Sequence, residues 1–150
     1  MPLAGVDRPA FDALEEGQEV FEAAKVIKRE DVKAYADASG DQNPLHQDDD
    51  FARSVGFPGI IAHGMFSMAH LVKSLKDWVG NPADLRSIDV QFRAVVYMDE
   101  TLVAKGRVAS KDPSTHEVTL DVWAELEREG QTVYPIKNGS AVVSLTPSGE

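Results

Sequence analysis

One long apolar segment, residues 62–78, restricts the fold of this chain more than any other feature of the sequence. Its apolar side chains would fall on several faces of a helix: Met65, Phe66, Met68, Ala69, Leu71, Val72 and Leu75. That distribution predicts a helix buried nearly all round. The wider window 57–75 also contains a proline, a glycine and basic side chains, so we expect a helix of a globular core and not a membrane span.

Around this segment the chain alternates between apolar and polar residues, as strands do. The alternating segments are 18–27, 85–97, 101–111, 117–127 and 131–145. Short turn signals separate the last four, which indicates antiparallel neighbours. Residues 29–39 have the spacing of a short helix ended by Gly40, and Pro44 excludes regular helix from the segment Asp41–His46.

This order of elements predicts an α+β fold in which an antiparallel sheet of about five strands wraps one long buried helix, the hot-dog fold. The length of 150 residues suits a single domain covering 1–150, with residues 1–17 as a loose lead-in. Such a sheet leaves an edge strand free, so we expect pairing into a homodimer.

The charge of the chain excludes several classes of partner. Its formal net charge is −10, which argues against nucleic acid and against an anionic membrane surface as partners. Only the segment 71–111 has a positive balance, +2, so an anionic ligand should prefer it, with Lys73, Lys76, Arg86 and Arg93 as the candidate contacts. The absence of cysteine and of an apolar leader in residues 1–19 leads us to expect a cytoplasmic protein.

Asp41 and His46 are the most informative pair of polar residues. They lie five positions apart on a proline-stiffened loop, where both side chains can point the same way. A carboxylate and an imidazole that converge can move a proton to and from water near neutral pH. The spacing alone favours a structural interpretation, in which Asp41 closes a turn and His46 makes a structural hydrogen bond.

Gly64, at the start of the long helix, is the second informative position. Its amide and the helix dipole could stabilise negative charge on a carbonyl oxygen, although tight helix packing would also explain a glycine. His63 and His70 are about 10 Å apart on a helix, too far to share a metal ion. The acidic triplet Asp48–Asp50 reads as a solvated helix start, so we predict no metal site.

Two segments together resemble a known family. Residues 39–46, Ser-Gly-Asp-Gln-Asn-Pro-Leu-His, and residues 61–65, Ile-Ala-His-Gly-Met, are similar to the hydratase 2 motif of the MaoC-like dehydratases. This family has the hot-dog fold and includes R-specific enoyl-CoA hydratases and 3-hydroxyacyl thioester dehydratases of type II fatty acid or mycolic acid synthesis. The likeness extends over residues 20–145.

The resemblance implies reversible hydration of trans-2-enoyl thioesters to (R)-3-hydroxyacyl thioesters. Asp41 and His46 would hold the water and share the acid and base duties, and the Gly64 amide would polarise the thioester carbonyl. We assign five further residues to substrate binding: Asn43, His63, Met65, Phe66 and Arg93. No cofactor is expected, because the substrate itself carries coenzyme A or phosphopantetheine on a carrier protein.

Two other functions stay open on the same fold. One is an acyl-CoA thioesterase, and the other is a non-catalytic subunit that binds acyl thioesters within a hetero-oligomeric dehydratase. The sequence leaves the acyl chain length, the carrier and the physiological direction undetermined.

Overall fold

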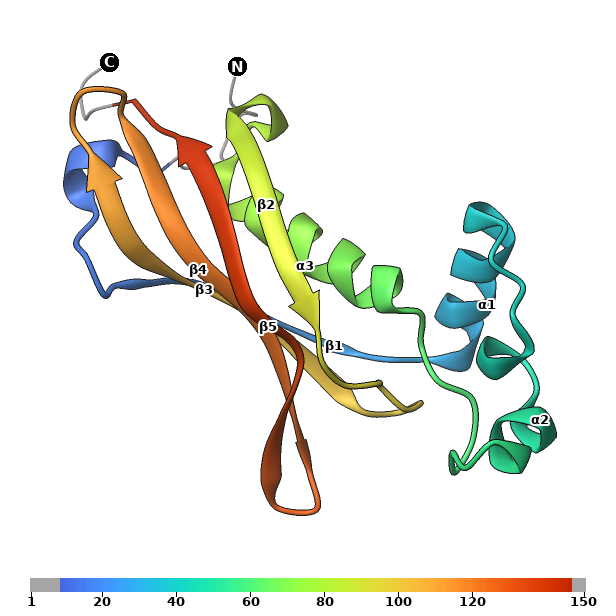
Figure 1. The fold of residues 1–150 in the computed structure, drawn as a ribbon. Helices are drawn as coiled ribbons and strands as arrows, with labels where there is room; N and C mark the ends of the chain where they lie inside the picture. The colour runs from blue at the N-terminus through green and yellow to red at the C-terminus, as the bar shows by residue number, and fades with distance from the viewer. Residues whose placement is uncertain (1–8, 147–150) are drawn as a thin grey trace.

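Five antiparallel strands form one sheet, and a long helix, α3, packs against one face of it (Figure 1). The computed structural model describes residues 9–146. The helices are α1 (Arg29–Ser39), α2 (Asp49–Ser54) and α3 (Gly64–Val79), with 3₁₀ turns η1 (Phe11–Ala13), η2 (Pro44–His46) and η3 (Pro82–Asp84). The strands are β1 (Glu19–Val26), β2 (Leu85–Phe92), β3 (Thr101–Asp112), β4 (Glu117–Arg128) and β5 (Gln131–Ser144).

The strand order is β1-β3-β4-β5-β2, so β1 and β2 are the edges of the sheet. The turn after β3 and the turn after β4 both use left-handed residues, His116 at φ 59° and Glu129 at φ 54°. These tight turns keep β3, β4 and β5 as antiparallel neighbours. The predicted α+β hot-dog arrangement is confirmed.

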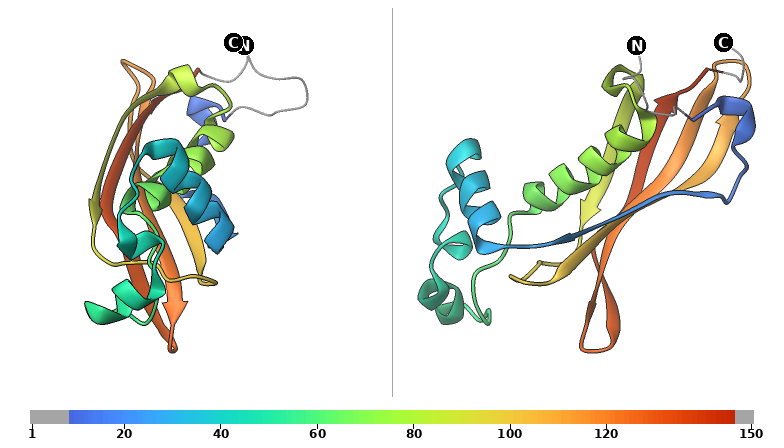
Figure 2. Two further views of the ribbon diagram at one scale, coloured as in Figure 1. Left: turned by 90° about the vertical axis from the view of Figure 1, so that its right-hand side faces the viewer. Right: turned by 180° about the vertical axis from the view of Figure 1, so that it is seen from behind.

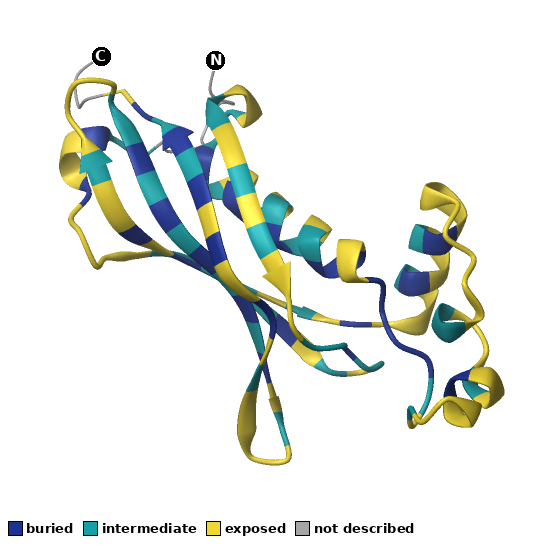
Figure 3. Cartoon of the chain, in the orientation of Figure 1, coloured by how far each residue is buried: buried dark blue, intermediate teal, exposed yellow. Residues whose placement is uncertain are grey.

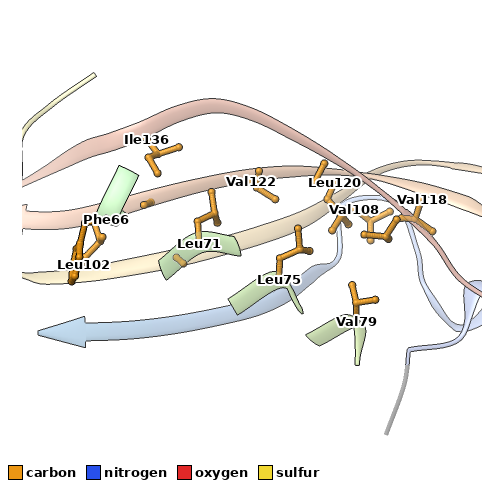
Figure 4. Packing of buried hydrophobic residues seen from close by; sticks show 14 of the residues in the cluster. Phe66, Leu71, Leu75, Val79, Leu102, Val108, Val118, Leu120, Val122 and Ile136 are labelled. Atoms are coloured by element: carbon orange, nitrogen blue, oxygen red, sulfur yellow. The ribbon is translucent and has the colours of Figure 1, made fainter. Parts of the chain in front are cut away.

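The core lies between α3 and the sheet, because successive side chains of a strand point to opposite faces and one face packs on the helix. Along β4 every second residue from Val118 to Leu126 is buried, and the residues between them are more exposed (Figure 3). Figure 4 shows Phe66, Leu71, Leu75 and Val79 of α3 packed toward the strands.

α3 is buried on one side only, which corrects the expectation of burial nearly all round. Leu71 and Leu75 are fully buried, whereas Met65 is 56% exposed and Ala69 and Lys73 are also exposed. The reason is that a single sheet covers one face of the helix, and no other helix or strand within residues 9–146 covers the opposite face (Figure 2).

The segment predicted as one strand over 85–97 divides in two. β2 ends at Phe92, and the Arg93 amide still donates to the Pro135 carbonyl of β5 at 2.9 Å. The chain then leaves β5 and pairs with the segment before α3. The Ala62 amide donates to the Val96 carbonyl at 2.9 Å, and Ile61 forms an antiparallel bridge with Tyr97. The alternating pattern continues because residues 96–97 still bond to extended backbone, although to a different partner.

Residues 1–8 of the predicted lead-in, 1–17, lie outside the described residues. From residue 9 the lead-in differs from the expectation, because Phe11 and Leu14 belong to the hydrophobic core. The Phe11 amide donates to the Thr146 carbonyl at 2.9 Å, and Lys111 Nζ lies 4.5 Å from the Phe11 ring centroid. This segment therefore packs with the sheet.

α1, η2 and α2 form an arm beyond one end of α3, away from most of the sheet (Figures 1 and 2). The arm is joined to the rest of the chain at Ile61, whose amide donates to the Leu45 carbonyl at 3.0 Å. Across residues 9–146, none of the helices has both the length and the apolar character needed to cross a bilayer.

Candidate active site

The loop after α1 has the local structure that its sequence predicts. Gly40 ends α1 in the left-handed conformation at φ 81°, which is readily adopted by glycine. Asn43 then caps η2, with its Oδ1 accepting from the Leu45 amide at 3.0 Å, and Pro44 occupies the first position of the turn. Asn43, predicted to bind substrate, thus has an observed role in fixing the loop.

His46, at the end of η2, is held in a defined orientation. Its Nδ1 lies 2.7 Å from the Ile61 carbonyl oxygen. Because a carbonyl can only accept, Nδ1 must carry the hydrogen, and in the neutral ring Nε2 is then an acceptor. This tautomer leaves Nε2 available to take a proton from a bound water.

Asp41 lies on the same loop and close to His46. The carboxylate Oδ1 accepts from the Asn43 amide at 3.3 Å, and the side chain is 53% exposed. One ligating atom from each of Asp41, His46 and His63 lies within 4.8 Å of the others. The convergence expected from loop placement is therefore observed, and the catalytic role of the pair stays a prediction.

The same three residues could in principle hold a metal ion, but their geometry is unsuited to it. The rings of His46 and His63 are stacked, with centroids 3.7 Å apart and planes inclined by 24°. An imidazole binds a metal through its in-plane lone pair. Stacked rings direct these lone pairs into separate planes and would have to rotate to share one ion.

Gly64 is the first residue of α3, so no carbonyl one turn earlier is available to its amide. The Gly64 residue is exposed. A Cβ at this position would meet the Phe92 ring at 3.4 Å, an ordinary contact with a side chain that is itself 48% exposed. Packing within the described chain does not demand glycine here, which favours the interpretation that a ligand approaches this amide.

The other predicted substrate-binding residues divide between surface and core. Met65 is exposed beside Gly64, whereas Phe66 is buried and meets the Tyr35 ring edge-on at 5.7 Å. The Arg93 guanidinium donates from Nε to Gln91 Oε1 at 3.1 Å, within β2 and its extension. His63 is buried at 2% exposure beneath the Asp41–His46 pair.

Two cations near His46 were missed by the sequence analysis. A cavity of about 270 Å³ is lined by His46, Gln47 and Ile60 together with Arg29 and Lys33 of α1. Both cations belong to an acidic part of the sequence, so charge balance along the chain gave no signal for them. Only the packing of the α1 N-terminus against η2 brings them to the site.

The acidic triplet has the structural role that was predicted for it. Asp48 caps α2 by accepting from the Phe51 amide at 3.1 Å, and Asp50 pairs with Arg53 at 3.0 Å. A hydrogen bond from the Ile60 amide, and then one from Arg29, hold the pKa of Asp49 below its usual value. Asp49 thereby links α1, α2 and the segment before α3.

Comparison with known proteins identifies the family of this chain. The family model "MaoC like domain" matches residues 12–128. An (R)-specific enoyl-CoA hydratase of Rhodospirillum rubrum is 30% identical over 126 residues, covering 81% of this chain and 87% of the relative. A mitochondrial 3-hydroxyacyl-[acyl-carrier-protein] dehydratase of Arabidopsis thaliana is 34% identical over 119 residues, covering 79% of this chain.

The match to some curated relatives is partial in length. The chain spans 61% of the plant dehydratase and 22% of a peroxisomal enoyl-CoA hydratase 2 from the same plant.

Among solved structures, the unliganded R-hydratase PhaJ1 of Pseudomonas aeruginosa superposes with a TM-score of 0.79 at 26% identity. That superposition covers 93% of this chain and 86% of the hydratase. The matching family model, the relatives of about 30% identity and the shared fold agree with one another. The chain belongs to the MaoC-like dehydratase family, which includes (R)-specific enoyl-CoA hydratases and 3-hydroxyacyl-ACP dehydratases.

Proposed function

We propose that this chain catalyses the reversible hydration of trans-2-enoyl thioesters to (R)-3-hydroxyacyl thioesters. The observation that carries the proposal is the paired placement of Asp41 and His46, with His46 Nδ1 occupied by the Ile61 carbonyl and Nε2 left as an acceptor. Its relatives include an (R)-specific enoyl-CoA hydratase and a 3-hydroxyacyl-ACP dehydratase, and these would run the same reaction in its two directions.

The chemistry follows from what the two side chains can do. A water held between Asp41 and His46 gives a proton to this pair as its oxygen bonds to C3 of the enoyl group. The pair then returns a proton to C2, so one water is added and both residues regain their starting state. Dehydration is the same sequence in reverse.

Gly64 supplies the third part of the mechanism. As C3 is attacked, negative charge develops on the thioester carbonyl oxygen. The Gly64 amide, at the positive end of the α3 dipole, can donate a hydrogen bond to that oxygen. In this proposal Asn43 fixes the loop, and Met65 lies beside the reacting group.

The assembly and the carrier are part of the same proposal. We infer a homodimer acting on acyl thioesters of coenzyme A or of acyl carrier protein in the cytoplasm. The exposed apolar residues Met65 and Phe92 near the start of α3 support a partner surface. Pairing with a different hot-dog chain is the hetero-oligomeric form of this proposal.

The test is hydration of crotonyl-CoA and longer enoyl-CoAs. The reaction is monitored through the decrease in absorbance as the conjugated thioester is consumed. We expect activity in the purified protein and its loss in Asp41→Asn and His46→Ala, each with an unchanged circular dichroism spectrum. The product should be resistant to an (S)-specific 3-hydroxyacyl-CoA dehydrogenase. Release of free thiol without hydration would identify a thioesterase, and activity only with a second chain would identify a subunit role.

A further inference from the structure

His63 is the one described histidine that is almost completely buried, with 2% of its surface exposed. It precedes α3 as its N-cap residue, in an extended conformation at φ −62° and ψ 142°. The Tyr35 ring meets it edge-on at 4.9 Å, and the His46 ring covers one of its faces. A side chain enclosed in this way has little surface left for direct contact with a substrate.

His63 makes its hydrogen bond to Asp41, one of the two residues of the Asp41–His46 pair. Its Nε2 lies 3.1 Å from the Asp41 carbonyl oxygen, so Nε2 carries the hydrogen and donates it. The same nitrogen is 4.0 Å from Asp41 Oδ2. His63 therefore holds the backbone of Asp41 without donating a hydrogen bond to its carboxylate.

The stacking contact acts on His46. With centroids 3.7 Å apart and an interplanar angle of 24°, the His63 ring limits rotation of the His46 ring about its Cβ–Cγ bond. A rotation of half a turn would exchange Nδ1 with Cδ2 and Nε2 with Cε1, and it would break the bond to the Ile61 carbonyl. The stack therefore keeps Nε2 as the outward acceptor.

The buried position of His63 leaves one of its ring nitrogens without a hydrogen-bond partner. Among the described residues, its Nδ1 is buried without a hydrogen-bond partner. A buried polar atom left without a partner destabilises the folded state, because it loses its hydrogen bonds to water and gains none in return. An apolar ring would avoid that cost, so core packing alone does not explain a histidine at this position.

We propose that His63 is a positioning residue for the hydration reaction, fixing the Asp41 backbone with its Nε2–H and the His46 ring plane with its aromatic face. The inference rests on the proposed hydratase function and replaces the direct substrate contact predicted for His63. His63 acts through the two residues and not on the substrate.

Three substitutions separate the two contacts. His63→Phe keeps the aromatic face and loses the donor, His63→Gln keeps a donor of similar reach and loses the face, and His63→Ala loses both. His70→Gln is the matched control, because it removes a histidine within α3 whose Nε2 contacts the Ala23 carbonyl at 2.9 Å, away from the Asp41–His46 pair.

With crotonyl-CoA as the probe, we expect kcat to fall about 100-fold in His63→Ala, with KM within about threefold of wild type. His63→Phe and His63→Gln should each recover part of that loss, and His70→Gln should retain wild-type kcat. A rise in KM with unchanged kcat would mean substrate binding and would overturn the proposal. Wild-type kcat in both folded His63→Phe and folded His63→Gln would also overturn the proposal. These two variants test the proposal if His63→Ala fails to fold.

A second measurement does not depend on activity. Nitrogen-15 NMR of the imidazole rings should show His46 as a single Nδ1–H tautomer in wild type and in His63→Phe, and as a mixture in His63→Gln. An unchanged single tautomer in both variants would overturn the role of the stack. If wild type shows this pattern but hydrates no enoyl thioester, then the proposed function fails while the positioning by His63 stands.

Discussion

Arg128 and Glu100 form a two-pronged ion pair, with Arg128 Nε donating to Glu100 Oε2 at 2.7 Å and the second guanidinium nitrogen donating to Oε1 at 2.6 Å. The pair is mostly buried, and this hydrogen bonding raises the pKa of Arg128. Glu100 also accepts from the Tyr97 amide at 2.7 Å, and Tyr97 pairs with Ile61, whose carbonyl holds His46. The ion pair thus supports the orientation of His46 from outside the site.

Breaking this pair should lower the stability of the protein. Glu100→Gln or Arg128→Met alone leaves one mostly buried charge unpaired, and we expect each to lower the free energy of unfolding by about 2–3 kcal/mol. The double variant Glu100→Gln/Arg128→Met should be less destabilised than the sum of the two. Urea denaturation of the four proteins measures this coupling, and strict additivity would contradict it.

The amide of Gly64 can be removed without removing the helix. Proline is favoured at the first helical position, and the extended conformation of His63 already suits a residue before proline. We therefore expect Gly64→Pro to fold and to lose about 100- to 1000-fold in kcat, the effect of removing one donor to a developing oxyanion.

Gly64→Ala is the matched control for that loss. It keeps the amide and adds only a Cβ near the Phe92 ring. Its kcat should stay within about tenfold of wild type, with circular dichroism confirming the fold of both variants. Equal losses in Gly64→Ala and Gly64→Pro would mean that space, and not the amide, is what the site needs.

Local rules were enough to place most of the site. The spacing of residues 29–39 predicted a helix, Gly40 predicted its end, and Pro44 predicted an irregular loop. These predictions are confirmed because each depends on the backbone preferences of nearby residues and not on distant contacts. The same holds for Gly64 at the start of α3, which lies two residues later than the predicted helix start.

The contacts of His63 could not be predicted in this way. They depend on Ile61 bonding to Leu45 on one side and to Tyr97 on the other, which brings distant segments together. The exposed face of α3 was missed for a related reason. An apolar residue such as Met65 has the same sequence signal whether its own chain or a second chain covers it.

That exposed surface predicts the oligomeric state. Met65 and Phe92 are 56% and 48% exposed, beside the unpaired edge of β2, which is the kind of surface that a second copy would cover. Light scattering should give twice the 16.3 kDa mass of the chain. Phe92→Glu should weaken dimerisation at least tenfold, whereas Tyr134→Glu, on exposed β5 surface, should not. A monomer with full activity would contradict this prediction.

His70 predicts how stability depends on pH. Burial is the main cause that lowers the pKa of His70 below its usual 6.5, and Lys25 and Lys73 add to the effect. Between the lowered pKa and 6.5 the unfolded chain binds a proton that the folded chain does not. The contribution of His70 to stability is therefore complete above pH 6.5 and is lost as the pH falls through the folded-state pKa. Urea denaturation between pH 5.5 and 8 should show this decline in wild type and a shallower one in His70→Gln. Parallel curves for the two proteins would show that His70 is not the group responsible.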